Sequence, residues 1–233
     1  MLQSRLMESS SASLRLPRRV RAAALAAIGG TQGRARAGRG ETFGELAWMS
    51  WAGTVWRLAG PDGAVYVKRA AALAGERDRL EWLQGRLPVP EVVGFFEAAG
   101  DDWLMTREVA GFPLYHRSIG WPSSRVARLF GEILRTIHAT DAADCPFGTR
   151  KRGNVLVHGD YCLPNVLVTD GVLTGLIDVG QTGLGDPRQD LAAGVWTLQY
   201  NFGPGHARHF LEAYGAPPMT DQEIERLRRK YGR

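Results

Sequence analysis

The pair Asp170-Gly171, set between two apolar stretches, most constrains how this chain can fold. The stretches on either side indicate two β-strands, and an Asp-Gly pair between strands favours a two-residue hairpin turn. With that turn, Asn165 pairs opposite Leu176, and Asp178 lies one diagonal step away on the same face. A three-residue turn would instead place the two polar side chains on opposite faces. The sequence therefore predicts that one cation can contact both Asn165 and Asp178.

A His-Gly-Asp motif ending at Asp160 precedes this hairpin. Phosphoryl transfer needs one residue to orient and deprotonate an acceptor hydroxyl, and carboxylate or amide oxygens to hold Mg²⁺ against a triphosphate. Asp160 suits the first task, and Asn165 with Asp178 the second. Taken singly, such residues more often only end a strand or a turn. Together, at this spacing, they predict ATP- and Mg²⁺-dependent phosphoryl transfer.

Composition places the chain among soluble globular proteins. Its 233 residues, 44% of them hydrophobic, can bury a core as one domain or as two small lobes. No apolar run approaches the roughly 20 residues that span a bilayer, which favours a cytoplasmic protein with no membrane partner. Cys145 and Cys162 lack metal-ligand spacing, so we expect reduced thiols and neither a disulfide framework nor a zinc site.

The net charge of +5 does not by itself indicate a nucleic-acid partner. Basic residues gather at the two ends of the chain rather than in a patch with interleaved aromatic residues. Residues 1–40 are rich in Arg, Ser, Gly and Ala. They resemble a transit peptide in composition, or a translated upstream region without a role, and we favour the second. The sequence predicts a loosely ordered extension here, with a short alanine helix candidate between its Ser-rich and Gly-rich stretches.

Strands come before helices along the rest of the chain. Expected strands are 54–58, 64–68, 91–98, 103–109 and the two of the hairpin, and expected helices are 71–87, 124–138, 190–200, 206–214 and 221–230. This order predicts an α+β fold of two lobes. We expect a small β-rich nucleotide-binding lobe over residues 41–109 and a mainly helical catalytic and substrate lobe over 110–233.

Glu76 falls on the apolar stripe of the helix expected at 71–87. A carboxylate on a buried helix face is costly unless a cation meets it, and Lys68, at the end of the preceding strand, is the nearest candidate. In kinases a strand lysine paired with a helix glutamate holds the nucleotide phosphates. The alternative is that both residues are solvated surface side chains.

From about residue 41 to residue 214, these motifs resemble those of the aminoglycoside 3'-phosphotransferases, antibiotic-resistance kinases with a protein-kinase-like fold. The His-Gly-Asp loop is the most specific part of the resemblance, which also includes Val65-Tyr66-Val67-Lys68, Cys145-Pro146-Phe147 and Ile177-Asp178. The resemblance implies a two-lobed kinase that uses ATP and Mg²⁺ to phosphorylate a hydroxyl of a small molecule, with an aminoglycoside as the expected acceptor.

Residue roles follow from the resemblance position by position. It implies that Asp160 is the catalytic base and that Asn165 and Asp178 are Mg²⁺ ligands. Lys68 would contact the α- and β-phosphates, with Glu76 orienting it. The remaining positions are Ser50 in a nucleotide-positioning loop, Glu108, Val109 and Ala110 in the adenine-binding hinge, and His158 and Asp190 as supports of the catalytic loop.

Two departures from the family pattern concern the acceptor. Family members carry several tens of residues, including an acidic substrate loop, between the Cys-Pro-Phe segment and the catalytic loop. Here only residues 148–157 intervene, and they are basic. The carboxyl terminus, which in the family supplies acidic and aromatic substrate contacts, ends in Arg228-Arg229-Lys230-Tyr231-Gly232-Arg233. A polycationic antibiotic should be attracted poorly to such a site.

Three interpretations therefore remain. The first is an aminoglycoside kinase, and the second is a kinase of another hydroxylated metabolite or antibiotic. The third is a shortened kinase-like protein that binds nucleotide without turnover. Retention of Asp160 argues against the third, because a binding module has no need of an acceptor-side base.

Overall fold

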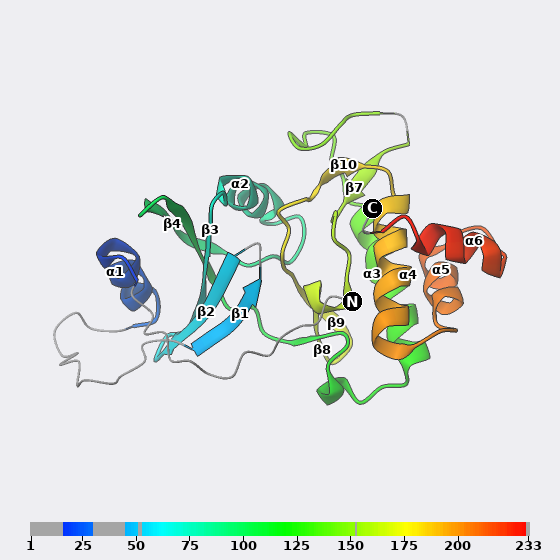
Figure 1. The fold of residues 1–233 in the computed structure, drawn as a ribbon, viewed down its shortest axis with the longest axis horizontal. Coiled ribbons are helices and arrows are strands. Elements are labelled where there is room, and N and C mark those ends of the chain that lie inside the picture. Colours follow the sequence, from blue (N-terminus) through cyan, green and yellow to red (C-terminus); the bar gives the residue numbers. More distant parts are fainter. Residues whose placement is uncertain (1–15, 30–44, 51–52, 152, 232–233) are drawn as a thin grey trace. The chain divides into compact units, whose positions relative to one another are not determined.

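The structure contains a β-rich unit and a mainly helical unit, which confirms the predicted α+β class (Figure 1). It is a computed structural model that describes residues 16–29, 45–50, 53–151 and 153–231, with the backbone alone for 45–50. Unit 1 comprises Met1–Ala71 and Val93–Thr106, and unit 2 comprises Ala72–Val92 and Arg107–Arg233. Residues 72–92, which we expected in the first lobe, thus belong by their contacts to unit 2.

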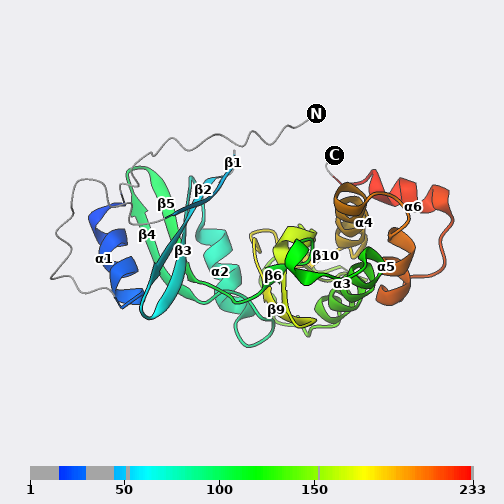
Figure 2. The same ribbon diagram turned by 90° about the horizontal axis from the view of Figure 1, so that it is seen from below.

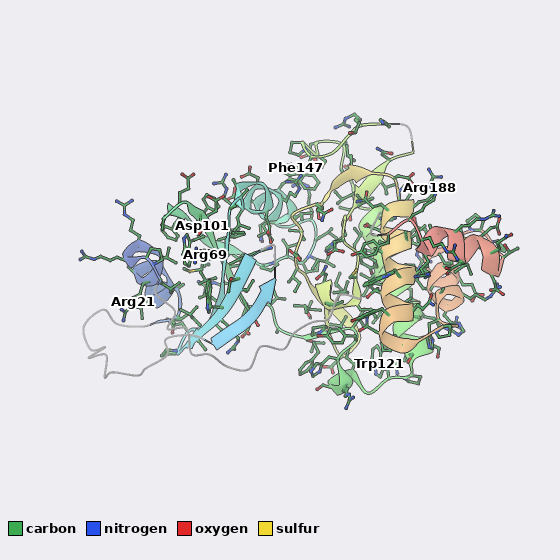
Figure 3. The ribbon with its side chains drawn as sticks, viewed as in Figure 1. Arg21, Arg69, Asp101, Trp121, Phe147 and Arg188 are labelled. Atoms are coloured by element: carbon green, nitrogen blue, oxygen red, sulfur yellow. The ribbon has the colours of Figure 1, made fainter. Side chains whose placement is uncertain are left out.

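A five-stranded sheet forms unit 1, in the order β1-β2-β3-β5-β4. Its strands are β1 (Glu45–Ser50), β2 (Gly53–Gly60), β3 (Gly63–Ala70), β4 (Val92–Ala98) and β5 (Asp101–Arg107). The last four confirm the predicted strands, and β1 was not predicted. Between β3 and β5, Arg69 and Asp101 form an ion pair of 2.6 Å and lie side by side in Figure 3.

Helix α1 (Arg18–Ala27) agrees with the short alanine helix candidate of the amino-terminal stretch, but its packing corrects our prediction of a loosely ordered extension. We expected residues 1–40 to be loosely ordered, but Val20, Ala24 and Ile28 are buried in one core with the sheet residues Leu58 and Val65 (Figure 2). The backbone is tied as well, because Asp62 N donates to Ile28 O at 3.2 Å. The sequence indicated a short helix here, but not that its small apolar face packs on the sheet. Residues 1–15 and 30–44 lie outside the described part.

Val20→Ala tests whether α1 contributes to the fold. The Val20 side chain is fully buried, so removing two methyl groups should lower the free energy of unfolding by about 2 kcal/mol in urea denaturation. Arg19→Ala, at an exposed position one residue earlier, is the control and should change the stability little. Equal stability of Val20→Ala and the unaltered protein would mean that α1 does not pack on the sheet.

Unit 2 is built mainly from helices. These are α2 (Ala74–Leu83), α3 (Ser123–His138), α4 (Arg188–Phe202), α5 (Ala207–Tyr214) and α6 (Asp221–Arg228), all of them predicted. Its strands are β6 (Phe112–Pro113), β7 (Val155–Val157), β8 (Val166–Thr169), β9 (Val172–Leu176) and β10 (Gly183–Gly185). Strands of two or three residues carry no periodicity, so β6, β7 and β10 escaped prediction. Among the described helices, none has the length and hydropathy of a membrane-spanning segment.

Phe130 of α3 lies at the centre of the core of unit 2. Its ring stacks on Tyr161 at 4.2 Å between centroids and contacts Phe210 of α5 at 5.3 Å. At Gly131 an added Cβ would lie 2.2 Å from Phe210 O, so only glycine allows α3 and α5 to approach so closely. The Tyr161 hydroxyl donates to Phe130 O at 2.7 Å. The loop that follows the His-Gly-Asp motif is thereby anchored on α3.

Candidate active site

The turn between β8 and β9 has the two-residue form that the sequence predicts. Thr169 pairs with Val172, and Asp170 and Gly171 both adopt positive φ angles of 51° and 84°. This is the backbone of a type I′ turn, in which an Asp-Gly pair is favoured because both positions need a left-handed conformation. The prediction of the turn is confirmed.

The pairing register expected from this turn is wrong by one residue. Val166, and not Asn165, pairs with Leu176, because the register shifts between Leu167 and Val168. A β-bulge on β9 inserts one extra residue and moves every later pair by one position. Asn165 now lies across from Ile177, whose N–H donates to Asn165 O at 3.0 Å.

Asp178 is directed by its own backbone and not by strand alternation. Strand β9 ends at Leu176, and Asp178 has a φ of +60°. Few residues other than glycine occupy this left-handed region, and aspartate is among those that tolerate it. Strained backbone of this kind gathers at functional sites. Just beyond, a Cβ placed on Gly180 would lie 3.6 Å from Glu76 Oε2, so the carboxylate of α2 lies against this segment.

Asp160 is held through both of its carboxylate oxygens. The side-chain nitrogen of Asn165 donates to Asp160 Oδ2 at 3.2 Å and to its backbone oxygen at 2.9 Å. The Tyr231 hydroxyl donates to Oδ1 at 2.5 Å, and the Cys162 thiol lies 3.4 Å from the same oxygen. The candidate base and the candidate cation ligand Asn165 are therefore in direct contact.

Asp190 supports the backbone of the His-Gly-Asp motif from the first turn of α4. Its carboxylate is fully buried and accepts from His158 N at 2.6 Å and from Gly159 N at 2.9 Å. His138 Nε2 lies 3.1 Å from the same carboxylate, and its Nδ1 lies 2.9 Å from the Tyr214 hydroxyl. A buried carboxylate is tolerated when donors satisfy it in this way.

The His158 ring joins the motif to the end of β9. Its Nε2 lies 3.1 Å from Ile177 O, and Asp160 N donates to its Nδ1 at 3.3 Å. Since the backbone oxygen can only accept, the proton belongs on Nε2, and Nδ1 is the acceptor. Both ring nitrogens are thus used within the chain, which fits the supporting role predicted for His158.

Cys162 is a neutral thiol beside the candidate base. Burial, and after it the negative charge of Asp160, raise the pKa of this thiol to about 12. A thiol is nucleophilic only when it is ionised, so Cys162 has no nucleophilic role at neutral pH. Cys145 and Cys162 are both buried and neither forms a disulfide, as predicted.

The donor set beside Asp160 fits a hard divalent cation. The Asn165 amide nitrogen is committed to Asp160, which leaves the amide oxygen to contact a cation. A carboxylate from Asp178 would complete the predicted set of ligands. Mg²⁺ prefers oxygen ligands and is usually bound by one or two side chains together with substrate phosphates. Among the described residues, no group of three or more His, Cys, Asp or Glu side chains is arranged to hold a metal ion alone.

The residues predicted to bind the nucleotide are divided between the two units. Ser50 ends β1 and pairs with Gly53, and Lys68 pairs with Val55 within the sheet of unit 1. Glu76 lies in the first turn of α2, in unit 2. The predicted hinge, Glu108 to Ala110, belongs to unit 2 and connects β5 to β6, with Glu108 and Ala110 exposed.

Tyr231 and Trp196 are the site residues that sequence reasoning missed. Tyr231 contacts Asp160 from 71 positions away, and its ring lies 5.1 Å from that of Trp196 on α4. Tyr231 sits in a basic run and Trp196 in the interior of a helix, so neither carries a local motif. The only available signal was the aromatic contact that the resemblance ascribes to the carboxyl terminus.

Comparison with known proteins agrees with this geometry. The sequence matches the phosphotransferase enzyme family (APH) over residues 45–155 and 149–228. An aminoglycoside 3'-phosphotransferase of Streptomyces ribosidificus is 31% identical over 234 residues, covering 73% of this chain and 87% of that protein. The chain belongs to the phosphotransferase enzyme family. The predicted resemblance and the predicted enzyme class are confirmed.

Solved structures agree on the fold of this phosphotransferase. The aminoglycoside-3'-phosphotransferase of type VIII superposes with a TM-score of 0.66 at 28% identity, covering 81% of this chain and 93% of that one. A thermostable mutant of the aminoglycoside phosphotransferase APH(4)-Ia, in ternary complex with AMP-PNP and hygromycin B, gives 0.62 at 15% identity over 91% and 88% of the two chains. The kinase-like fold expected from the resemblance is confirmed.

Asp190→Asn tests the support of the catalytic loop. The amide presents an N–H group to at least one of the two backbone donors, so we expect unfolding to become easier by about 2–4 kcal/mol. Asp186→Asn is the matched control, because Asp186 pairs with Arg188 at the surface and surface pairs contribute little. Urea denaturation of both variants is the measurement. A loss no larger than that of the control would contradict the role of Asp190.

Proposed function

We propose that this protein transfers the γ-phosphoryl group of ATP, with Mg²⁺, to a hydroxyl of a small molecule, and that an aminoglycoside is the first acceptor to test. The arrangement around Asp160 carries the proposal. Its carboxylate is bonded by Asn165 and lies on a loop whose backbone N–H groups bind the buried Asp190. The 31% identity to an aminoglycoside 3'-phosphotransferase supports this choice of acceptor.

Asp160 acts on the acceptor in this proposal. Its carboxylate accepts the hydroxyl proton while the acceptor oxygen attacks the γ-phosphorus, and a weak base is enough because the transition state is loose. Asn165 fixes the carboxylate through Oδ2. Asn165 and Asp178 would hold Mg²⁺, which neutralises charge on the phosphates when it is bound.

The nucleotide side of the proposal rests on residues spread along the chain. We propose that Lys68 contacts the phosphates, with Glu76 orienting it, and that Ser50 lies in the nucleotide-positioning loop. The segment Glu108 to Ala110 would bind the adenine. The fold relative APH(4)-Ia has been solved with AMP-PNP bound, which supports a nucleotide as the phosphoryl donor. We place the reaction in the cytoplasm, in keeping with two unpaired thiols.

One observation favours a different hydroxylated acceptor as the second candidate. Two carboxylates in the carboxyl-terminal part of the chain are neutralised within the chain, since Glu225 binds Arg228 and Arg229 and Asp186 binds Arg188. The short loop before β7 also carries Arg150, whose guanidinium donates to Ala143 O. Such surroundings attract a polycation poorly and tolerate a neutral or anionic acceptor.

Measuring ADP release across a panel of acceptors decides between these candidates. The panel contains kanamycin, neomycin, and neutral and anionic hydroxylated compounds, each with and without Mg²⁺. Turnover with kanamycin or neomycin supports the first candidate, and turnover only with uncharged or anionic compounds supports the second. Nucleotide binding that depends on Mg²⁺ without turnover on any acceptor would contradict both and favour a non-catalytic protein.

Asp160→Asn and Asp178→Ala should separate the two halves of the reaction. Asp160→Asn should reduce kcat by about 100-fold or more, the range of general-base contributions, with ATP affinity nearly unchanged because the base contacts the acceptor. Asp178→Ala should weaken Mg²⁺-dependent ATP binding. Calorimetric binding of ATP with and without Mg²⁺ gives the affinities. Equal loss of ATP affinity in both variants would contradict this division of roles.

A further inference from the structure

The segment after α6 brings the Tyr231 hydroxyl onto the candidate base. This hydroxyl donates to Asp160 Oδ1 at 2.5 Å, although 71 positions separate the two residues. The segment is fixed by its own backbone, since Lys230 N donates to Leu227 O and Tyr231 N donates to Arg228 O. The contact is therefore part of an ordered turn that ends the described chain.

Three side chains contact the carboxylate of Asp160. Oδ2 accepts from the Asn165 amide at 3.2 Å, while Oδ1 faces both the Tyr231 hydroxyl and the Cys162 thiol. The Tyr231 hydroxyl occupies one of the two lone pairs of Oδ1, and the thiol, which also lies 3.3 Å from that hydroxyl, lies against the other. An acceptor alcohol must give its proton to this same carboxylate and finds Oδ1, the more heavily bonded oxygen, in use.

The ring of Tyr231 is supported from the side of α4. It lies 5.1 Å from the Trp196 ring, and Trp196 in turn stacks on Tyr200 at 5.2 Å. Burial, and after it the hydrogen bond to Asp160, raise the pKa of Tyr231 above its usual value. The hydroxyl therefore remains protonated and remains a donor at neutral pH.

We propose that the Tyr231 hydroxyl occupies the position of the acceptor alcohol on Asp160, as a competitor built into the chain. This inference rests on the proposed function, because it takes Asp160 as the base. During transfer the acceptor O–H bond gives its proton to Oδ1, a bond forms between the acceptor oxygen and the γ-phosphorus, and the bond from that phosphorus to the departing ADP breaks. The carboxyl-terminal turn has to release Oδ1 before this step.

Tyr231→Phe keeps the ring and removes the competing hydroxyl. We expect the KM for kanamycin, or for whichever panel compound is turned over, to fall about three- to tenfold, with kcat changed less than twofold. ADP release without any acceptor should rise about threefold or more, because water then reaches Oδ1. Tyr200→Phe is the matched control, since it removes an exposed hydroxyl from the same aromatic group and should leave both quantities unchanged.

If the unaltered protein turns over an acceptor, two results would overturn the proposal. One is an unchanged or raised KM in Tyr231→Phe, as expected if the hydroxyl positions the acceptor. The other comes from thermal unfolding of Tyr231→Phe, Asp160→Ala and the double variant. If the two residues are in contact, the loss of Tm caused by Tyr231→Phe should disappear in the Asp160→Ala background. A loss that persists in full contradicts the contact.

Failure of the proposed function would look different. In that case neither the unaltered protein nor Tyr231→Phe would consume ATP with any acceptor, and the competition would fail together with the function. Turnover by the unaltered protein combined with a raised KM in Tyr231→Phe would instead contradict the competition alone.

Discussion

One buried carboxylate, that of Asp190, fixes the loop on which the chemistry of this chain depends. Two consecutive N–H groups, from His158 and Gly159, point into unit 2 away from water and need acceptors there. Asp190 supplies both acceptors from the first turn of α4, where a negative charge is favoured by the helix dipole. His138 satisfies the same carboxylate from α3. The Asp190 carboxylate is thus held by three parts of the chain: its own helix α4, the backbone of His158 and Gly159, and His138 of α3.

From this point hydrogen bonds connect the motif to Asn165 and to Ile177, the residue before Asp178. The His158 ring connects the backbone of Asp160 to Ile177, the residue before Asp178. The amide of Asn165 then connects β8 to the Asp160 carboxylate. The proposed base Asp160 and the proposed cation ligand Asn165 are thereby joined in one hydrogen-bond network.

The sequence could predict those features of the site that neighbouring residues determine, and not those that depend on tertiary packing. Asp170-Gly171 identified its turn because few other residues accept positive φ at both positions. The bulge at Thr174 was invisible, since it depends on packing against other segments, and it made the expected register wrong by one residue. The short amino-terminal helix could be suspected from its alanines, but the burial of Val20 against the sheet had no local signal. Tyr231 reaches Asp160 only through the tertiary fold, and no nearby pattern marks it.

A crystal structure of the protein with Mg²⁺ and AMP-PNP tests the central claim most directly. The account predicts one cation that contacts the amide oxygen of Asn165 and the carboxylate of Asp178 together with the nucleotide phosphates, and the carboxylate of Asp160 facing the γ-phosphate. A cation bound away from both side chains, or an Asp160 carboxylate directed away from the γ-phosphate, would contradict it.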